Sequence, residues 1–158
     1  MNSSARRGAG SRRRRSWRGW AGLAGALVAL AAPGQAAEPR RVAIQLTVSL
    51  ISNQPGEIDP RGSKLHDKLK GQIRYKSLRV IRAERVELRR NEVFSLALPD
   101  ASAFLVRPLD FGDDGVLMAV EVEDVLKMDL RARNGHVVVI RAGSFEDGSL
   151  VIGLEPQY

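Results

Sequence analysis

The chain has 158 residues and no cysteine, so it can neither form a disulfide nor carry the lipid of an acylated lipoprotein. It has only two histidines, and it has no stretch of about 20 apolar residues that would span a membrane as a helix. Zinc sites are built from clusters of His, Cys or carboxylate ligands, and two isolated histidines do not form one. Packing alone must therefore hold the fold together.

The scarcity of histidine also limits the chemistry that the chain can perform. Nucleophilic catalysis needs a base beside the nucleophile, most often histidine. His66 lies on the outward side of a predicted short helix and His136 follows a predicted turn, so both are expected in solvent without a catalytic role. The sequence has no GxSxG elbow and no phosphate-binding glycine loop. These absences predict a protein that is not an enzyme and uses no cofactor.

The first 37 residues have the three parts of a secretory signal peptide. Seven arginines precede Trp20, and no acidic residue occurs before Glu38. An apolar run over residues 21–32 follows, and small residues around Ala36 and Ala37 permit cleavage after either one. We expect residues 1–37 to be removed on export, which leaves residues 38–158 as a single β-rich domain.

The export route is predicted from the arginines. Arg14 and Arg15, followed by Ser16 and Trp17, resemble a twin-arginine signal, but Arg13 occupies the place of the usual Ser or Thr. The general secretory route is therefore favoured, and the twin-arginine route stays possible. The product is expected in the periplasm or outside the cell.

The formal charge of +7 belongs to this leader. Without its seven arginines the chain keeps 18 basic residues against 18 acids. A basic arm that binds nucleic acid is the alternative interpretation, but such arms are polar throughout and do not continue into twelve apolar residues. The neutral mature chain gives no electrostatic argument for nucleic-acid binding, and it contains no membrane span.

The pattern of residues 38–158 is strongly β. Residues 42–51 alternate between apolar and polar side chains, which indicates a half-buried strand. A short helix is expected over residues 64–70, capped by Ser63 and stopped at Gly71. A long strand over residues 73–88 is expected to bend or bulge near residues 82–84.

Shorter strands follow, separated by turns at regular spacing. They are expected over residues 93–98, 103–110, 116–122, 126–132, 136–141 and 150–154. Asn134-Gly135 is the strongest hairpin signal among the turns. The sequence therefore predicts an all-β, mainly antiparallel fold: a β-sandwich or partly closed barrel of seven or eight strands with one short helix near its start.

One loop gathers carboxylates. Asp110, Asp113 and Asp114 are close together in sequence, and calcium binds several oxygen ligands on a flexible loop. The plainer interpretation is a hairpin turn, in which Asp and Gly are favoured by the backbone, and the spacing matches no EF-hand. A carboxylate-based hydrolase is the least favoured function. It would use two carboxylates as an acid/base pair, for example two of Asp110, Asp113, Asp114 and Glu121.

Charge is segregated along the chain. Residues 61–90 have a net charge of +8 and residues 91–129 a net charge of −7. The basic block could bind an anionic glycan, lipid headgroups or an acidic partner, or it could pair with an adjacent acidic strand and guard an exposed edge. The candidate binding residues are Arg74, Lys76, Arg79, Arg82, Arg85, Arg89 and Arg90.

Several short motifs resemble a group of small exported β-rich proteins from myxobacteria and related deltaproteobacteria. They are Asp59-Pro60-Arg61, Leu65, Leu69, Tyr75, Ser77, Arg79-Val80, Gly143, Asp147-Gly148 and Leu150-Val151-Ile152. The resemblance covers roughly residues 42–154 and implies export and a β fold. It implies no activity, cofactor or site residue.

The function expected from these observations is that of an exported, noncatalytic envelope protein: a small β module that binds an envelope protein or itself. The alternative is a ligand- or ion-binding module, with calcium at the loop of residues 110–115 or an anionic glycan or lipid on the basic strand.

Overall fold

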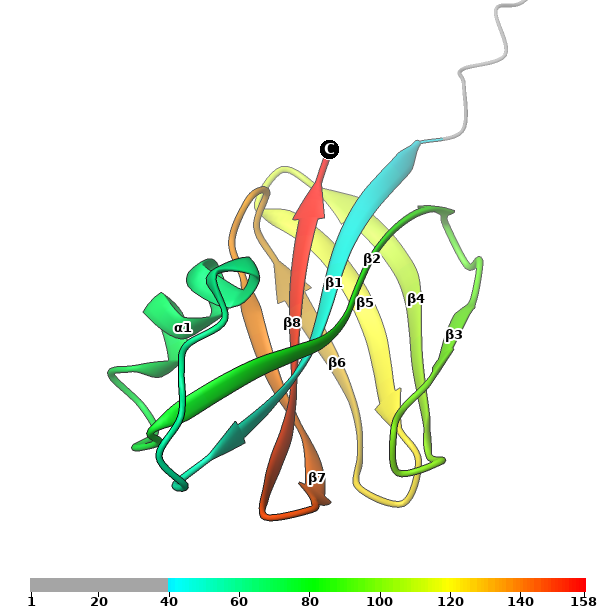
Figure 1. Ribbon diagram of the computed structural model, residues 1–158. Coiled ribbons are helices and arrows are strands. Elements are labelled where there is room, and N and C mark those ends of the chain that lie inside the picture. Colours follow the sequence, from blue (N-terminus) through cyan, green and yellow to red (C-terminus); the bar gives the residue numbers. More distant parts are fainter. Residues whose placement is uncertain (1–39) are drawn as a thin grey trace, which may run out of the picture. The chain divides into compact units, whose positions relative to one another are not determined.

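The computed structural model describes residues 40–158, which form two four-stranded antiparallel sheets and one short helix (Figure 1). Sheet A has the order β2-β1-β8-β7 and sheet B the order β3-β4-β5-β6. The strands are β1 (Arg41–Ser52), β2 (Ser77–Arg89), β3 (Phe94–Ala97), β4 (Ala103–Gly112), β5 (Gly115–Val122), β6 (Leu126–Ala132), β7 (Val138–Phe145) and β8 (Gly148–Gln157). The predicted all-β fold is confirmed, in its sandwich form. The predicted signal peptide lies outside the described residues.

The main core lies between the two sheets. In β1, Val42, Ile44 and Leu46 are fully buried, and they pack with Phe104 of β4 and Met118 of β5. The alternation predicted for residues 42–51 is therefore real, and its apolar face turns toward sheet B.

A second, smaller core lies on the outer face of sheet A. The helix α1 (Ser63–Leu69) and the short 3-10 turn η1 (Pro60–Gly62) before it connect β1 to β2 and cover one end of this face (Figure 1). Leu65 and Leu69 of α1 are buried there against Ile51, Leu78 and Val151. The predicted four-residue spacing of the two leucines is what puts both under the helix.

The start of α1 differs from the prediction. Ser63 is the first residue of the helix rather than its cap, and Gly62 stands at the N-cap without a side-chain hydrogen bond. Instead, Asp59 caps the preceding η1 turn by accepting a hydrogen bond from the backbone N–H of Arg61. In the part of the chain that is described, no helix is long and apolar enough to cross a membrane.

The predicted bulge in the long basic strand is present, one residue before the predicted place. Val80 pairs with Ser49 and Arg82 with Val48, so Ile81 is the extra residue. Because a bulge changes which face the following side chains occupy, Leu78 and Val80 pack under α1 while Val86 and Leu88 pack between the sheets. The strand also starts later than predicted, at Ser77.

The hairpin predicted at Asn134-Gly135 is wrong. β6 pairs only with β5, and β7 pairs only with β8, so residues 133–137 cross from sheet B to sheet A. The local turn does form: His136 N–H donates to Arg133 O, and Gly135 has φ +70. Turn chemistry fixes the chain reversal, but burial of the flanking side chains decides which strands pair.

Candidate functional site

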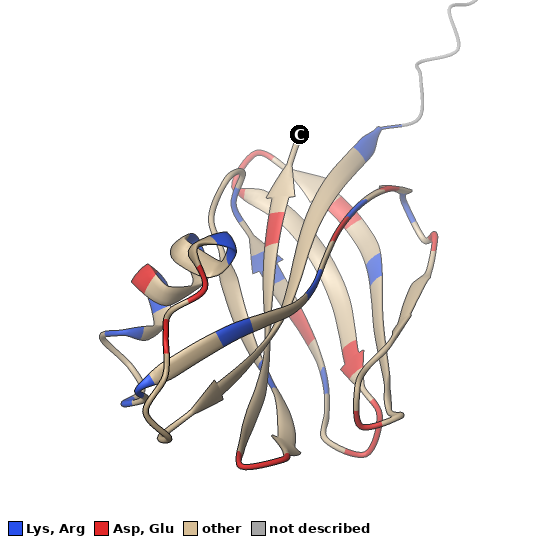
Figure 2. Cartoon of the chain, in the orientation of Figure 1, with Lys and Arg blue, Asp and Glu red and all other residues tan. Residues whose placement is uncertain are grey.

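The basic residues proposed for binding lie on or next to an edge strand. β2 pairs with β1 on one side only, and residues 57–59 cover the first part of its other side through hydrogen bonds with Leu78. The acidic strand expected beside it belongs to sheet B, so the predicted cross-strand neutralisation is wrong (Figure 2). The alternative role of these charges, protection of a sheet edge, fits this position.

Several of these basic side chains instead meet acids one by one. Arg79 lies 3.1 Å from Glu146 in the β7–β8 turn, and Arg90 lies 3.4 Å from Asp110 of β4. Arg82 lies 3.0 Å from Glu84 on its own strand, although not in hydrogen-bond geometry. The remaining candidates, Arg74, Lys76, Arg85 and Arg89, are exposed.

The acidic residues predicted as calcium or acid/base candidates are dispersed. Asp110 lies within β4 rather than in a loop, and Asp114 forms an ion pair with Arg131. Glu121 forms an ion pair with Lys127. It is also distant from Asp110, because Asp110 pairs with Leu117, four residues before Glu121 on β5. Among residues 40–158 no three His, Asp or Glu side chains are grouped to hold a metal ion. Calcium binding at this loop therefore has no structural support.

The two histidines differ in their surroundings. His136 is exposed, as expected. His66 was also expected in solvent, but it is half-buried, because its ring packs edge to face against Tyr75 and its Nδ1 lies 2.6 Å from the Tyr75 hydroxyl. Burial raises the pKa of Tyr75. The pair links the middle of α1 to the segment that leads into β2.

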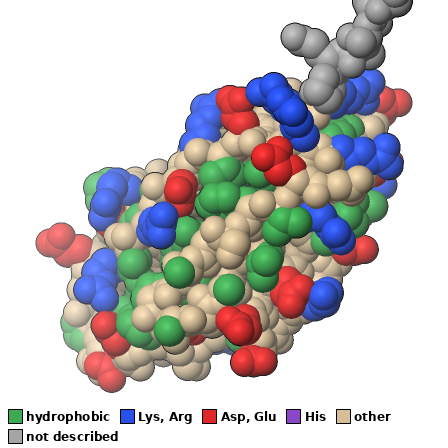
Figure 3. Space-filling view, turned by 90° about the vertical axis from the view of Figure 1, so that its right-hand side faces the viewer, with side chains coloured by type: hydrophobic (Ala, Val, Ile, Leu, Met, Phe, Trp, Pro, Cys, Tyr) green, Lys and Arg blue, Asp and Glu red, His purple; other side chains and the backbone are tan. Residues whose placement is uncertain are grey.

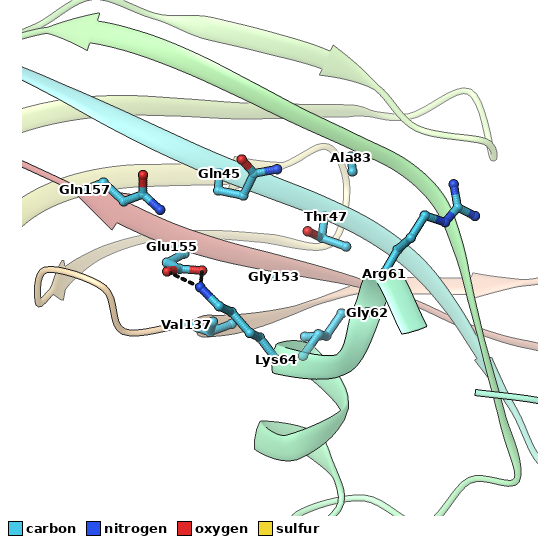
Figure 4. A pocket seen from close by; sticks show the side chains of 11 residues that line it. Gln45, Thr47, Arg61, Gly62, Lys64, Ala83, Val137, Gly153, Glu155 and Gln157 are labelled. Atoms are coloured by element: carbon cyan, nitrogen blue, oxygen red, sulfur yellow. Dashed lines mark hydrogen bonds and ion pairs between the residues drawn. The ribbon is translucent and has the colours of Figure 1, made fainter. Parts of the chain in front are cut away.

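A hollow lies beside α1 on the outer face of sheet A (Figure 4). We call it the trough. Its volume is about 300 Å³, and the sheet forms its floor while η1 and the first turn of α1 form one wall. Its sides carry Gln45, Gln157, Arg61, Lys64 and Glu155.

The floor of the trough is a row of small residues across three strands. Thr47 of β1 lies opposite Ala83 of β2 on one side and opposite Gly153 of β8 on the other. A methyl group on Gly153 would come within 3.3 Å of Leu65, so the glycine lets the helix approach β8 closely. Small side chains here leave the space open that larger ones would fill.

An ion pair ties the helix wall to the sheet. The Lys64 ammonium donates hydrogen bonds to both carboxylate oxygens of Glu155, at 2.8 and 3.0 Å. Glu155 is only 6% exposed although it lies on the outer face of the sheet. Because a buried carboxylate needs a partner, this pair holds the first turn of α1 at a fixed distance from β8.

A second ion pair fixes the other end of the same wall. The Arg61 guanidinium donates to both oxygens of Asp59, and Asp59 also accepts hydrogen bonds from the backbone N–H groups of Arg61 and Val80. These hydrogen bonds, with that from the Arg61 side chain largest, lower the pKa of Asp59 from 3.8 to about 2. The Asp59 carboxylate therefore stays ionised, and paired with Arg61, at all but strongly acidic pH.

The side chains that line the trough can bind a ligand by hydrogen bonds. Gln45 and Gln157 each present an amide that can donate and accept, and Thr47 presents a hydroxyl. The charged groups of Lys64 and Glu155 already satisfy each other. Amides and hydroxyls over a flat floor suit a ligand rich in its own donors and acceptors, such as extended polypeptide.

Sequence reasoning missed the trough, although two signals of it were visible. Gln45 and Thr47 stand on the polar face of a strand whose other face is fully apolar. Gly153 interrupts an otherwise bulky last strand, L-V-I-G-L-E. Neither observation indicates a site until α1 is known to lie over the same face.

Comparison with known proteins finds no matching family model, no matching curated protein and no matching solved structure. The resemblance to exported proteins of myxobacteria therefore stays a prediction, and the function must be argued from the site.

Proposed function

We propose that the protein is an exported, noncatalytic binding module of the cell envelope, which holds an extended segment of a partner protein in the trough. The observation that carries this proposal is the small-residue floor of Ala83, Thr47 and Gly153, which lies beside the wall of η1 and α1 and next to two glutamine amides of the sheet. A segment of polypeptide offers regularly spaced N–H and C=O groups, which match the amides of Gln45 and Gln157.

The state of the ionised groups favours binding over catalysis. A general acid or base must exchange a proton with a substrate. Both oxygens of Glu155 accept hydrogen bonds from Lys64, and both oxygens of Asp59 accept them from Arg61. These carboxylates are engaged in fixing the wall of the trough, so we assign them a structural role.

Export rests on the leader pattern of residues 1–37. We expect the protein isolated from cells to begin at Ala37 or Glu38, as N-terminal sequencing would show. We also expect it in the periplasmic or extracellular fraction, because the arginine-rich start, the short apolar run and the small residues direct secretion and cleavage. A chain that begins at Met1 and stays in the cytoplasm would contradict export.

The binding role is tested by filling the trough. Ala83 is exposed on edge strand β2, so Ala83→Trp places a large ring over the floor without disturbing the core. We expect this variant to lose at least about tenfold in affinity for the partner, equivalent to about 1.4 kcal/mol. The measurement is capture from an envelope extract with quantitative mass spectrometry, followed by titration of the captured protein.

Ala97→Trp is the matched control. Ala97 is also an exposed alanine, it lies on β3, an edge strand of the other sheet, and it does not line the trough. Both variants should melt within a few degrees of the original protein, and only Ala83→Trp should lose the partner. Equal capture by the two variants would show that the partner does not bind in the trough.

A further inference from the structure

Four arginines meet at the end of the sandwich where the described chain begins. Arg40 and Arg41 stand at the start of β1, and Arg89 and Arg90 stand at the end of β2. Basic side chains gather at this end of the molecule in the space-filling view (Figure 3). Three of them, Arg40, Arg89 and Arg90, line a hollow of about 490 Å³ together with Asp110 and Phe111. We call it the arginine hollow.

The guanidinium groups are positioned by the fold. A bulge in β4 at Leu109 leaves its carbonyl outside the ladder, and Arg90 Nε donates to that oxygen at 2.7 Å. Arg40 Nη1 donates to the carbonyl of Phe111 at 3.4 Å. Each arginine has five N–H donors in all, so most of them stay available to a ligand.

The charge of the cluster is only partly compensated. Arg41 and Arg89 lie directly opposite each other in the antiparallel β1–β2 pair, where like charges destabilise a sheet. Asp110 lies 3.4 Å from Arg90, and Glu92 uses one oxygen to accept the backbone N–H of Arg89. The charged residues that line the hollow are three arginines and Asp110, which leaves a net charge of +2 there. An anion bound there would relieve this repulsion.

We propose that the arginine hollow binds a phosphate-type oxyanion. Arginine matches such groups because its planar fork donates two parallel hydrogen bonds to two oxygens. Arg40 and Arg89 supply the free donors, and Arg90 is held in place by Leu109 and Asp110. This site is separate from the trough, which Arg40, Arg41, Arg89 and Arg90 do not line.

The test uses two sources of the same chemistry. The chain isolated from cells is titrated with inorganic phosphate, and it is separately mixed with vesicles of phosphatidylglycerol or of phosphatidylcholine. We expect binding to at least one phosphate source, with affinity that falls as salt is added. Saturation by inorganic phosphate without vesicle binding identifies a soluble phosphorylated ligand. Binding to phosphatidylglycerol vesicles but not to phosphatidylcholine identifies an anionic lipid headgroup.

Paired variants separate this site from general basic charge. The double variant with Arg40→Gln and Arg89→Gln should bind the phosphate source at least about tenfold more weakly. Arg85→Gln with Arg107→Gln removes the same charge from two exposed arginines outside the hollow and should change affinity much less. In the absence of anion, Arg89→Gln should not lower the melting temperature, because it removes the repulsion with Arg41. Equal losses in the two pairs, or no binding to either phosphate source, would overturn the proposal.

Discussion

Gly148→Ala is expected to destabilise the protein strongly. Among the glycines that are not buried, we expect this one to tolerate alanine least. Gly148 opens β8 opposite Ser52 of β1, directly after the two-residue turn of Glu146 and Asp147. A methyl group on Gly148 would overlap the carbonyl oxygen of Ile51 and press on Leu50. Overpacking against side chains costs about 1–3 kcal/mol, and here backbone must move, so we expect about 3 kcal/mol or more.

The measurement is the free energy of unfolding in denaturant, with the melting temperature as a second readout. A loss of this size lowers the melting temperature by about 10 °C in a domain of this length. Gly71→Ala is the matched control, because a methyl group there meets no atom within 4 Å. That variant should be neutral or gain up to about 1 kcal/mol from reduced flexibility of the unfolded chain. If Gly148→Ala and Gly71→Ala lowered the free energy of unfolding equally, Gly148 would not lie close to the backbone of β1.

The strands were predictable where alternation has one buried face and one solvated face. β1 follows its pattern because Val42, Ile44 and Leu46 all point to the same core. The same reasoning is wrong for β2, in which Val80 and Val86 share a parity but pack in different cores. The bulge at Ile81 separates them. A bulge was expected from the length of the strand, but the unbroken parity of its apolar residues does not show that the two valines face different cores.

Sheet membership was not predictable from local signals. Residues 126–132 and 138–145 are separated by a good turn, yet they belong to different sheets. Sheet membership follows instead from how both strands are buried. Ala132 at the end of β6 and Ile140 of β7 are buried in the same main core, but they reach it from opposite sheets. A hairpin would have placed both on one sheet and left half of the core uncovered.

The charged residues show the same division between local and tertiary information. The basic block of residues 61–90 was visible in the sequence, but the acidic block that follows it does not pair with it in the sheet. The arginine hollow combines residues 40 and 41 with residues 89 and 90, which come together only because β1 and β2 are antiparallel and in register. The trough likewise needs the helix, the middle of β1 and the end of β8 in one place.

Leu69→Ala should detach α1 while the sandwich stays folded. Leu69 is fully buried under the helix, and removing a buried leucine side chain costs about 2–5 kcal/mol. A helix of seven residues has no stability of its own. The cost therefore falls on the docking of α1, which depends on the small core of Leu65, Leu69 and their neighbours on sheet A.

Hydrogen exchange distinguishes local from global opening. In Leu69→Ala, the amide of Lys70, which donates to His66 O, and that of Ile73, which donates to Leu69 O, should exchange faster than in the original protein. Amides of the central strands β1 and β8 should change much less. Leu96→Ala is the matched control, since Leu96 is a leucine 3% exposed in the main core on β3. It should accelerate exchange throughout the sandwich.

The same pair of variants connects stability to the proposed function. α1 carries Lys64 and Leu65 on the wall of the trough, so partner binding should fall in Leu69→Ala even at temperatures where β1 and β8 remain protected. Leu96→Ala should bind normally wherever it is folded, because sheet B contributes nothing to the trough. If Leu69→Ala still binds the partner while the amides of α1 exchange rapidly, the floor of sheet A is enough for binding and α1 is not part of the site.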